Sequence, residues 1–266
     1  MIDRAETAFL TLRRRYRQAR IVRAQRRASA DARRHGQRVV HMLHVRRTGG
    51  TAVHAALNET RIPPDLRLLL HAHGISLAHL PEEDEVFFFL REPVARFVSG
   101  FEMRRQEGGS RYHHPWTPGE RRAFMRFDSA QDLAMALGSR AHTERAEAEG
   151  AMKSIHHLRS HLSDWLVDEA QVRARKTRIM FVGWQERLDA DFASLGGLLG
   201  LPPTDLPADA YRANRIESDP ARRELSAEAT SIVRAWYADD YRLIRLLQEL
   251  GLTRPPSVFD DRLVMM

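Results

Sequence analysis

The chain of 266 residues contains no cysteine, which excludes disulfide bonds and thiolate metal sites and fits a reducing, cytoplasmic setting. Its longest purely apolar runs, such as residues 86–90, are too short to cross a bilayer, and the first thirty residues contain no apolar stretch of signal-peptide length. Lysine is scarce too, since only Lys153 and Lys176 occur among the 42 basic residues. We therefore expect a cytoplasmic protein that is soluble or at most peripheral at a membrane.

Positive charge is concentrated at the N-terminus. Of the net charge of +7, residues 1–35 hold +8, from eleven arginines against three acidic residues, so the remaining chain is close to neutral. Apolar residues recur here at three- and four-residue spacing, which predicts a helix over about residues 5–30. They are Ala5, Phe9, Leu12, Tyr16 and Ala19.

We interpret residues 1–37 as a basic amphipathic helical arm, and three roles for it stay open. It is a solvated helix docked by its narrow apolar face, or it contacts an anionic membrane, or it contacts a polyanionic acceptor. Nucleic-acid binding is disfavoured, because the arm lacks interleaved aromatic residues and the rest of the chain is not basic.

Short apolar runs alternate with helical patterns through the rest of the chain. The sequence predicts strands at residues 39–45, 66–70, 86–90 and 179–183. It predicts helices at residues 51–57, from 93 onward, and at 130–137, 146–160, 164–173, 188–199 and 226–250, with a loop at 108–118. This alternation indicates a single α/β domain over residues 38–252, with a mostly parallel sheet flanked by helices and a C-terminal tail at 253–266.

A glycine loop follows the first predicted strand, where residues 44–51 read H-V-R-R-T-G-G-T. Such a loop between a strand and a helix presents backbone N–H groups and the positive end of the helix dipole to an anion. Gly49 and Gly50 permit close approach, Thr48 and Thr51 add hydroxyl groups, and Arg47 adds a charge. The spacing and Lys-Ser/Thr pair of a Walker A loop are absent, which disfavours ATP or GTP hydrolysis.

A second anion site is predicted just beyond the strand at 86–90, where residues 91–101 read R-E-P-V-A-R-F-V-S-G-F. Arg91 stands where ligands bind in open α/β sheets, outside the carboxyl end of a strand. The guanidinium of Arg91 and the hydroxyl of Ser99 are the groups that would hold a phosphate there.

These two motifs, in this order and about forty residues apart, resemble those of sulfotransferases that use 3′-phosphoadenosine-5′-phosphosulfate. The first is similar to their 5′-phosphosulfate loop, H-x-P-K-T-G-G-T, and the second to their 3′-phosphate motif, R-D-P-x-x-R-F-x-S-G-F. Residues 182–188, V-G-W-Q-E-R-L, are similar to a later stretch of the family.

The resemblance implies a P-loop-NTPase-like sulfotransferase fold and transfer of a sulfuryl group to a hydroxyl of a carbohydrate or similar acceptor, without a metal ion. It assigns donor binding to the following residues: Arg46, Arg47, Thr48, Gly49, Gly50, Thr51, Arg91 and Ser99. Residues 214–218 are expected to close over the nucleotide.

A histidine pair lies between the two motifs, in His71-Ala72-His73-Gly74. This segment is similar to one in the family branch that includes heparan-sulfate 2-O-sulfotransferase, where it supplies the catalytic base. The resemblance therefore implies that His73 is the base, that His71 supports it, and that Arg47 stabilises the departing phosphate oxygen. Other histidines, including His157 and His161, show no comparable placement.

An alternative function follows from the positions where the family motif has proline and lysine and this chain has Arg46 and Arg47. A planar guanidinium is not equivalent to a compact ammonium aimed at one bridging oxygen. The second hypothesis is therefore a protein that binds the nucleotide without transferring sulfate.

Overall fold

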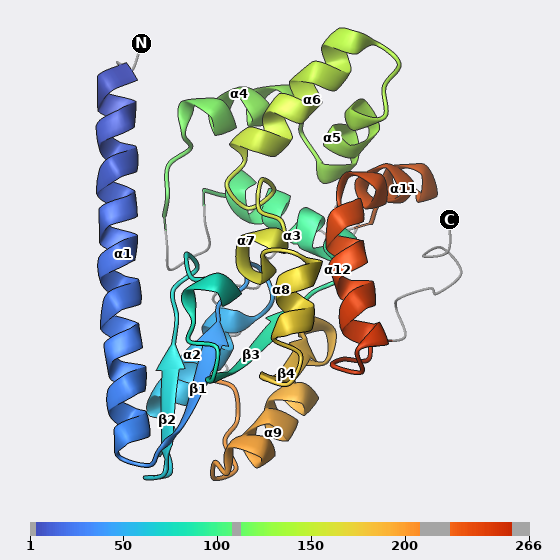
Figure 1. The fold of residues 1–266 in the computed structure, drawn as a ribbon. Coiled ribbons are helices and arrows are strands. Elements are labelled where there is room, and N and C mark those ends of the chain that lie inside the picture. Colours follow the sequence, from blue (N-terminus) through green and yellow to red (C-terminus); the bar gives the residue numbers. More distant parts are fainter. Residues whose placement is uncertain (1–3, 108–112, 208–223, 257–266) are drawn as a thin grey trace.

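The computed structural model describes residues 4–107, 113–207 and 224–256 (Figure 1). It contains a four-stranded sheet in the order β2-β1-β3-β4, parallel at every pairing. The strands are β1 (Arg38–Leu43), β2 (Leu66–Leu70), β3 (Glu85–Leu90) and β4 (Ile179–Trp184). The predicted parallel α/β sheet flanked by helices is confirmed, and each strand lies within two residues of its predicted bounds.

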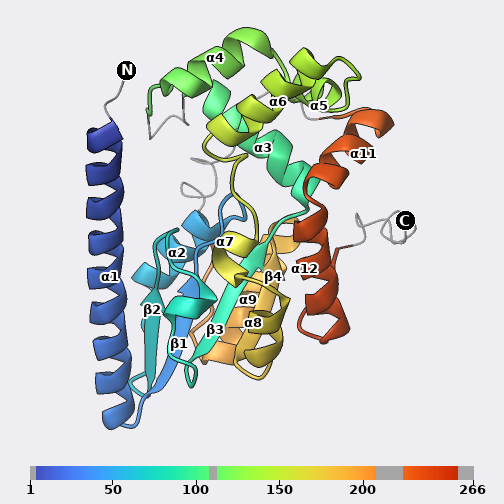
Figure 2. The ribbon, with the colours of Figure 1, turned by 45° about the horizontal axis from the view of Figure 1, so that its top comes forward.

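Helices connect the strands and cover the sheet. Before β4 they are α1 (Arg4–Arg34), α2 (Gly50–Glu59), η1 (Leu77–His79), α3 (Pro93–Arg105), α4 (Pro118–Arg126), α5 (Ala130–Leu137), α6 (His142–Ser154), α7 (Ser163–Leu166) and α8 (Glu169–Ala174). After β4 they are η2 (Gln185–Arg187), α9 (Leu188–Leu199), α11 (Ala227–Trp236) and α12 (Ala238–Glu249). Figures 1 and 2 show α4, α5 and α6 together beyond the carboxyl ends of the strands.

Helix α4 was not expected from the sequence, although its start carries a recognisable signal. Thr117 and Glu120 form a capping box around Pro118 at the first helical position. Residues 108–112 and 214–218, in the predicted loop and the predicted closing segment, lie outside the described residues.

Three predicted helices have different bounds in the structure. The helix expected at 146–160 ends at Ser154, because Ile155 adopts an extended conformation. The helix expected at 164–173 is divided at Val167, which has φ 72°, and Asp168 then caps α8 by accepting from the amide of Gln171. The helix expected at 226–250 is divided into α11 and α12 at Tyr237.

Both faces of the sheet are buried, as the continuous apolar run of β3 predicts. Phe87 and Phe89 face the cluster formed with α2 and α9, whereas Val86, Phe88 and Leu90 face the larger cluster formed with the helices that follow β3. This alternation follows from the two-residue period of a strand. Within the described part of the chain, no helix combines the length and hydropathy that a bilayer span requires.

Helix α1 lies alongside β1 and β2 (Figures 1 and 2), but it does not dock by those residues of the apolar stripe whose side chains are described. Leu12 and Tyr16 are each 66% exposed, so that expectation is wrong. The contacting side chains are mostly polar: Gln18 donates to the carbonyl of Gly74, and Gln25 donates to His71. The reason is that the surface beneath α1 presents polar groups that need hydrogen-bond partners.

Candidate functional site

The candidate site lies where the strand order of the sheet reverses. The chain passes from β1 to β2 on one side and returns to β3 on the other, so β1 and β3 flank a topological switch point. Ligands bind at such points, outside the carboxyl ends of the strands. The glycine loop follows β1, Arg91 follows β3, and His71–Gly74 follows β2, so all three predicted segments meet at one edge of the sheet.

Packing requires both glycines of the loop, and backbone conformation requires glycine at position 49 as well. Gly49 is the N-cap of α2, with φ 80°, and a Cβ there would lie 2.6 Å from the side chain of Leu188. A Cβ on Gly50 would lie 2.6 Å from the ring of His44. No side chain in the described residues caps α2, so its first amides face the loop without a side-chain acceptor.

Arg47 joins the two predicted phosphate motifs. Its Nη2 and Nε donate to the hydroxyl of Ser99 at 2.8 and 3.3 Å, and Arg91 donates to the Arg47 carbonyl at 3.5 Å. Burial and the neighbouring Arg91 lower the pKa of Arg47 to about 10, so it stays cationic at neutral pH. Arg47 also has φ 64°, a left-handed conformation that costs a non-glycine residue about 1–3 kcal/mol and recurs at functional sites.

The other loop residues differ in what they offer to a ligand. Thr48 is buried, and its hydroxyl donates to the carbonyl of Val45 at 3.0 Å, so this hydroxyl stabilises the loop itself. Arg46 donates to the hydroxyl of Ser160 at 3.5 Å. Thr51 is exposed in the first turn of α2.

His73 has the tautomer that a general base requires. Its Nδ1 lies 2.7 Å from the carbonyl oxygen of His44, which can only accept, so Nδ1 carries the proton and Nε2 keeps its lone pair. Burial lowers the pKa of His73, and the charges of Arg46 and Arg47 lower it further against the opposing effect of the His44 hydrogen bond. The ring packs on His44 with centroids 3.9 Å apart.

His71 faces a different part of the molecule. It is 1% exposed and forms a chain of hydrogen bonds in which Gln25 Nε2 lies 2.6 Å from its Nδ1 and His41 Nδ1 lies 2.7 Å from its Nε2. His41 Nε2 then lies 2.9 Å from the carboxylate of Asp84. Because Asp84 accepts, His41 donates from Nε2, His71 donates to His41, and Gln25 donates to His71.

With these partners, the buried His71 ring is satisfied in its neutral form. Burial lowers the pKa of His71 to about 3, in agreement with that tautomer. In the described residues, the side-chain hydrogen bonds of His71 run to α1 and to β1 rather than to His73. The predicted support of His73 by His71 therefore stays a prediction. Any such support would be indirect, through the position of the segment 71–74.

His44 and His157 also lie at the site: His44 is the first residue of the loop motif but had no predicted role, and His157 lies outside both motifs. Burial, followed by the charge of Arg47, lowers the pKa of His157 to about 2, and its Nδ1 is buried with no hydrogen-bond partner among the described residues. His157 packs against Gly100, in the second motif, and only a turn after α6 brings it there. The expectation that His157, unlike His71 and His73, is not placed near the two motifs is therefore wrong. His161 lies 3.5 Å from Asp240, the carboxylate that also pairs with Arg96.

The junction that carries Arg91 is fixed by buried carboxyl groups. Glu92 caps α3 by accepting from the amide of Ala95 at 2.6 Å, and Tyr241 donates to its other oxygen. Glu186, in the stretch similar to the later family motif, accepts from the amide of Glu92 at 3.0 Å. Burial raises the pKa of Glu186. These contacts hold Arg91 at the end of β3.

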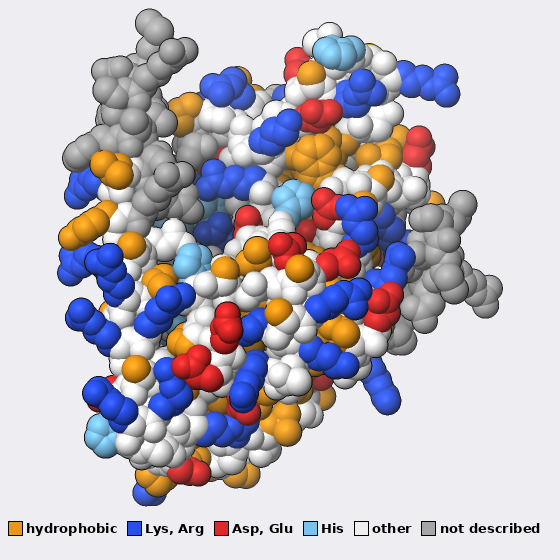
Figure 3. Space-filling view, in the orientation of Figure 1, with side chains coloured by type: hydrophobic (Ala, Val, Ile, Leu, Met, Phe, Trp, Pro, Cys, Tyr) orange, Lys and Arg blue, Asp and Glu red, His pale blue; other side chains and the backbone are white. Residues whose placement is uncertain are grey.

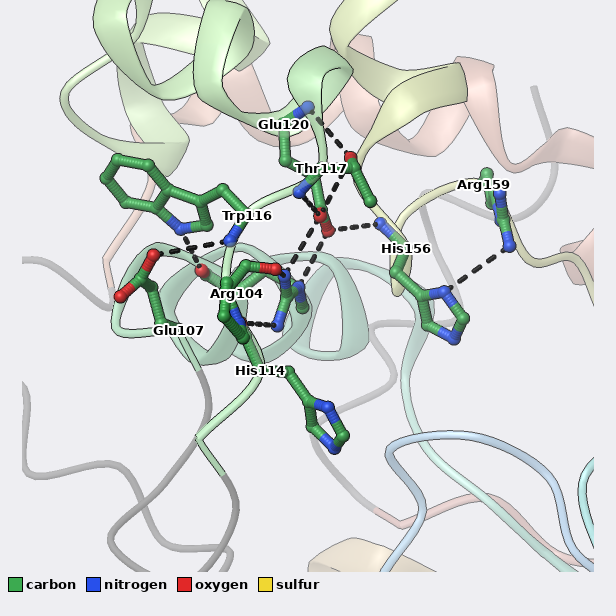
Figure 4. A network of polar contacts seen from close by, with 9 residues as sticks. Arg104, Glu107, His114, Trp116, Thr117, Glu120, His156 and Arg159 are labelled. Atoms are coloured by element: carbon green, nitrogen blue, oxygen red, sulfur yellow. Dashed lines mark hydrogen bonds and ion pairs between the residues drawn. The ribbon is translucent and has the colours of Figure 1, made fainter. Parts of the chain in front are cut away.

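A second network holds the turn that carries His156 and His157 (Figure 4). Arg104, in α3, donates to both oxygens of Glu120 at 2.7 and 2.9 Å, and the amide of His156 donates to Glu120 at 3.1 Å. These bonds lower the pKa of Glu120 to about 2 against the opposing effect of burial. The network therefore attaches α4 and the turn after α6 to the helix of the second motif.

No family model matches this chain, and no curated protein matches it. In the described residues, no group of three or more His, Asp or Glu side chains is arranged to hold a metal ion. The site is therefore defined by its own geometry: a glycine loop, three arginines and several neutral histidines at the carboxyl edge of a parallel sheet. Cationic side chains, loop amides and neutral rings in this arrangement are the groups that can accommodate anionic oxygens, and the ligand itself belongs to the proposal below.

Proposed function

We propose that the protein is a sulfotransferase that moves a sulfuryl group from 3′-phosphoadenosine-5′-phosphosulfate to a hydroxyl of a carbohydrate or similar acceptor. The observation that carries this proposal is the direct contact between the two motifs, where Arg47 of the first donates to Ser99 of the second. In this proposal the sheet belongs to a P-loop-NTPase-like sulfotransferase fold, and the enzyme works in the cytoplasm.

The donor's two phosphate groups have separate partners in this arrangement. The amides around Gly49 and Gly50, together with Arg46, Arg47 and Thr51, hold the 5′-phosphosulfate, and the N-terminus of α2 adds its dipole. Arg91 and Ser99 hold the 3′-phosphate, the group that distinguishes this donor from ATP. Because Arg47 contacts Ser99, its guanidinium lies at the boundary between the two subsites.

His73 acts as the base. Its Nε2 accepts the proton of the acceptor hydroxyl as that oxygen attacks sulfur, and its Nδ1–H bond to His44 holds the ring in the required tautomer. The donor supplies an activated sulfur with a phosphate leaving group. Arg47 and the loop amides stabilise the charge that develops on the departing oxygen, so positioning and electrostatics carry the rate.

A second candidate is a protein that binds the nucleotide without turnover. It is favoured by one observation, that the guanidinium of Arg47 is engaged with Ser99 through two nitrogens. If that engagement persists when the donor binds, the charge is directed to the 3′ side and not to the bridging oxygen.

Thermal unfolding with adenosine 3′,5′-bisphosphate, compared with ATP, tests both candidates, because a ligand that binds only the native state raises its stability. Both predict a rise in melting temperature with the bisphosphate that exceeds the rise with ATP, and both predict its loss in Arg91→Ala. The exposed Arg178→Ala is the matched control and keeps the shift. No shift in the parent protein rejects both candidates.

Release of the bisphosphate from the donor in the presence of acceptor separates the two candidates. The enzyme releases it, and His73→Gln lowers that release by about 10²–10⁴-fold while keeping the thermal shift. Arg47→Lys tests the second candidate directly: turnover that appears only in this variant assigns the parent protein to nucleotide binding alone.

A further inference from the structure

The outward face of α1 carries a row of arginines. Arg13, Arg20, Arg27 and Arg34 are all exposed and follow one another at seven-residue intervals. Seven residues make almost two full helical turns, so these side chains project from the same side of the helix. This side lies away from the one that Gln18, Gln25 and Ser29 present to the body of the protein.

Two large apolar side chains stand beside this row. Leu12 and Tyr16 are each 66% exposed, and their spacing of four residues places them on one side of the helix. They belong to the apolar stripe seen in the sequence, whose described members Leu12, Tyr16 and Ala19 are exposed. Figure 3 shows basic side chains along the edge of the molecule formed by α1, interrupted by exposed hydrophobic ones.

The row continues toward the C-terminal end of α1 into an open groove of about 460 Å³, lined by Arg27, Ala30, Arg33 and Arg34. We call the whole surface the basic ridge. It comprises Leu12, Arg13, Tyr16, Arg20, Arg27, Ala30 and Arg34, whereas Arg33 pairs with Glu83 and Asp84 of the protein body.

We propose that the basic ridge docks the protein on an anionic lipid surface. Arginines attract phosphate-bearing headgroups and can extend their charged ends along the interface while their stems pack on apolar groups. The exposed Leu12 and Tyr16 distinguish this partner from a soluble polyanion, because only a bilayer offers an apolar layer beneath the anionic groups. Charge complementarity is strong, since residues 1–35 hold more than the whole net charge of the chain.

Flotation of the full-length chain with vesicles tests the proposal. The protein is expected to float with vesicles of phosphatidylcholine and phosphatidylserine, to remain unbound with phosphatidylcholine alone, and to dissociate as the salt concentration rises. Each basic residue near an anionic bilayer strengthens binding about fivefold, so Arg13→Glu, Arg20→Glu and Arg27→Glu together lower the partition coefficient by about 100-fold or more.

A charge-matched control uses three exposed arginines of α4 and α6, changed as Arg121→Glu, Arg122→Glu and Arg145→Glu. These leave vesicle binding within about threefold of the parent protein, since they lie outside the ridge. Thermal unfolding of each variant checks that the exposed substitutions leave the fold intact.

Leu12→Ser with Tyr16→Ser separates a lipid surface from a soluble polyanion. This variant is expected to lose vesicle binding by at least tenfold while its binding to heparin or duplex DNA is unchanged. The proposal is overturned if the parent protein does not bind phosphatidylserine vesicles, if the control arginines matter as much as the ridge, or if the apolar pair has no effect. None of these readouts involves donor turnover, so the proposal stands or fails independently of the sulfotransferase assignment.

Discussion

Replacing His71 by glutamine is expected to make the stability of the protein less sensitive to acid. His71 is buried as a neutral ring between Gln25 and His41, and its pKa falls from 6.5 to about 3. Glutamine keeps an amide that can donate to His41 but has no group that titrates in this range.

The sign follows from where protons bind. Below pH 6.5 the unfolded chain binds a proton at His71, whereas the folded protein does not until the pH approaches 3, so stability is complete above pH 6.5 and is lost as the pH falls. One pKa unit is worth about 1.4 kcal/mol, so His71 alone removes about 2 kcal/mol between pH 8 and pH 5. The loss reaches at most about 5 kcal/mol near pH 3.

Urea unfolding at pH 8 and pH 5 gives the free energy of unfolding of the parent protein and of His71→Gln. The contribution of His71 is the difference between their losses over this pH range. At pH 8, His71→Gln costs about 1–3 kcal/mol, because one buried hydrogen bond is lost. Between pH 8 and pH 5 the variant loses about 2 kcal/mol less than the parent protein. The exposed His142→Gln serves as the control. Equal acid sensitivity in His71→Gln and the parent protein would refute the assignment of His71 as a buried neutral ring.

Two further substitutions probe the packing around the site. In Gly50→Ala the added methyl group would lie 2.6 Å from the His44 ring, so we expect a loss of about 1–3 kcal/mol in thermal unfolding, whereas Gly150→Ala meets no atom within 4 Å and should gain up to about 1 kcal/mol. Similar melting temperatures for these two variants would contradict the packing of His44 on the loop. Arg96→Met removes the buried ion-pair partner of Asp240 and is expected to cost about 3–5 kcal/mol. Adding Asp240→Leu should recover part of that loss, and a double-mutant cycle with no coupling would disprove the pairing.

The strands and the glycine loop were readable from the sequence because their signals are local. A run such as residues 86–90 is apolar at every position and rich in β-branched and aromatic residues, as expected of a strand buried on both faces. Two adjacent glycines between a strand and a helix likewise predict an anion-binding loop without knowledge of the fold. The bounds of α5 and α9 were predicted for the same reason, since their apolar periodicity is complete within the segment.

The orientation of α1 could not be read in this way. Its apolar stripe predicts the docking face, but the surface beside β1 and β2 presents His41, His71 and Asp84, whose hydrogen bonds are satisfied by α1. Three buried polar groups left without partners would together cost about 3–9 kcal/mol, against about 3–6 kcal/mol gained by burying two large apolar side chains. The polar face was therefore selected, and Leu12 and Tyr16 were left exposed.

The parallel α/β sheet and the two motifs at its carboxyl edge follow from local sequence signals, because periodicity and glycine placement act within a few residues. Long-range packing, by contrast, directs His71 to α1 and His73 to His44, and it brings His157 to the second motif from a distant turn. It also decided that Arg47 bonds to Ser99. These contacts join residues from separate elements, and their partners are fixed by strand order and helix packing, which no local pattern contains.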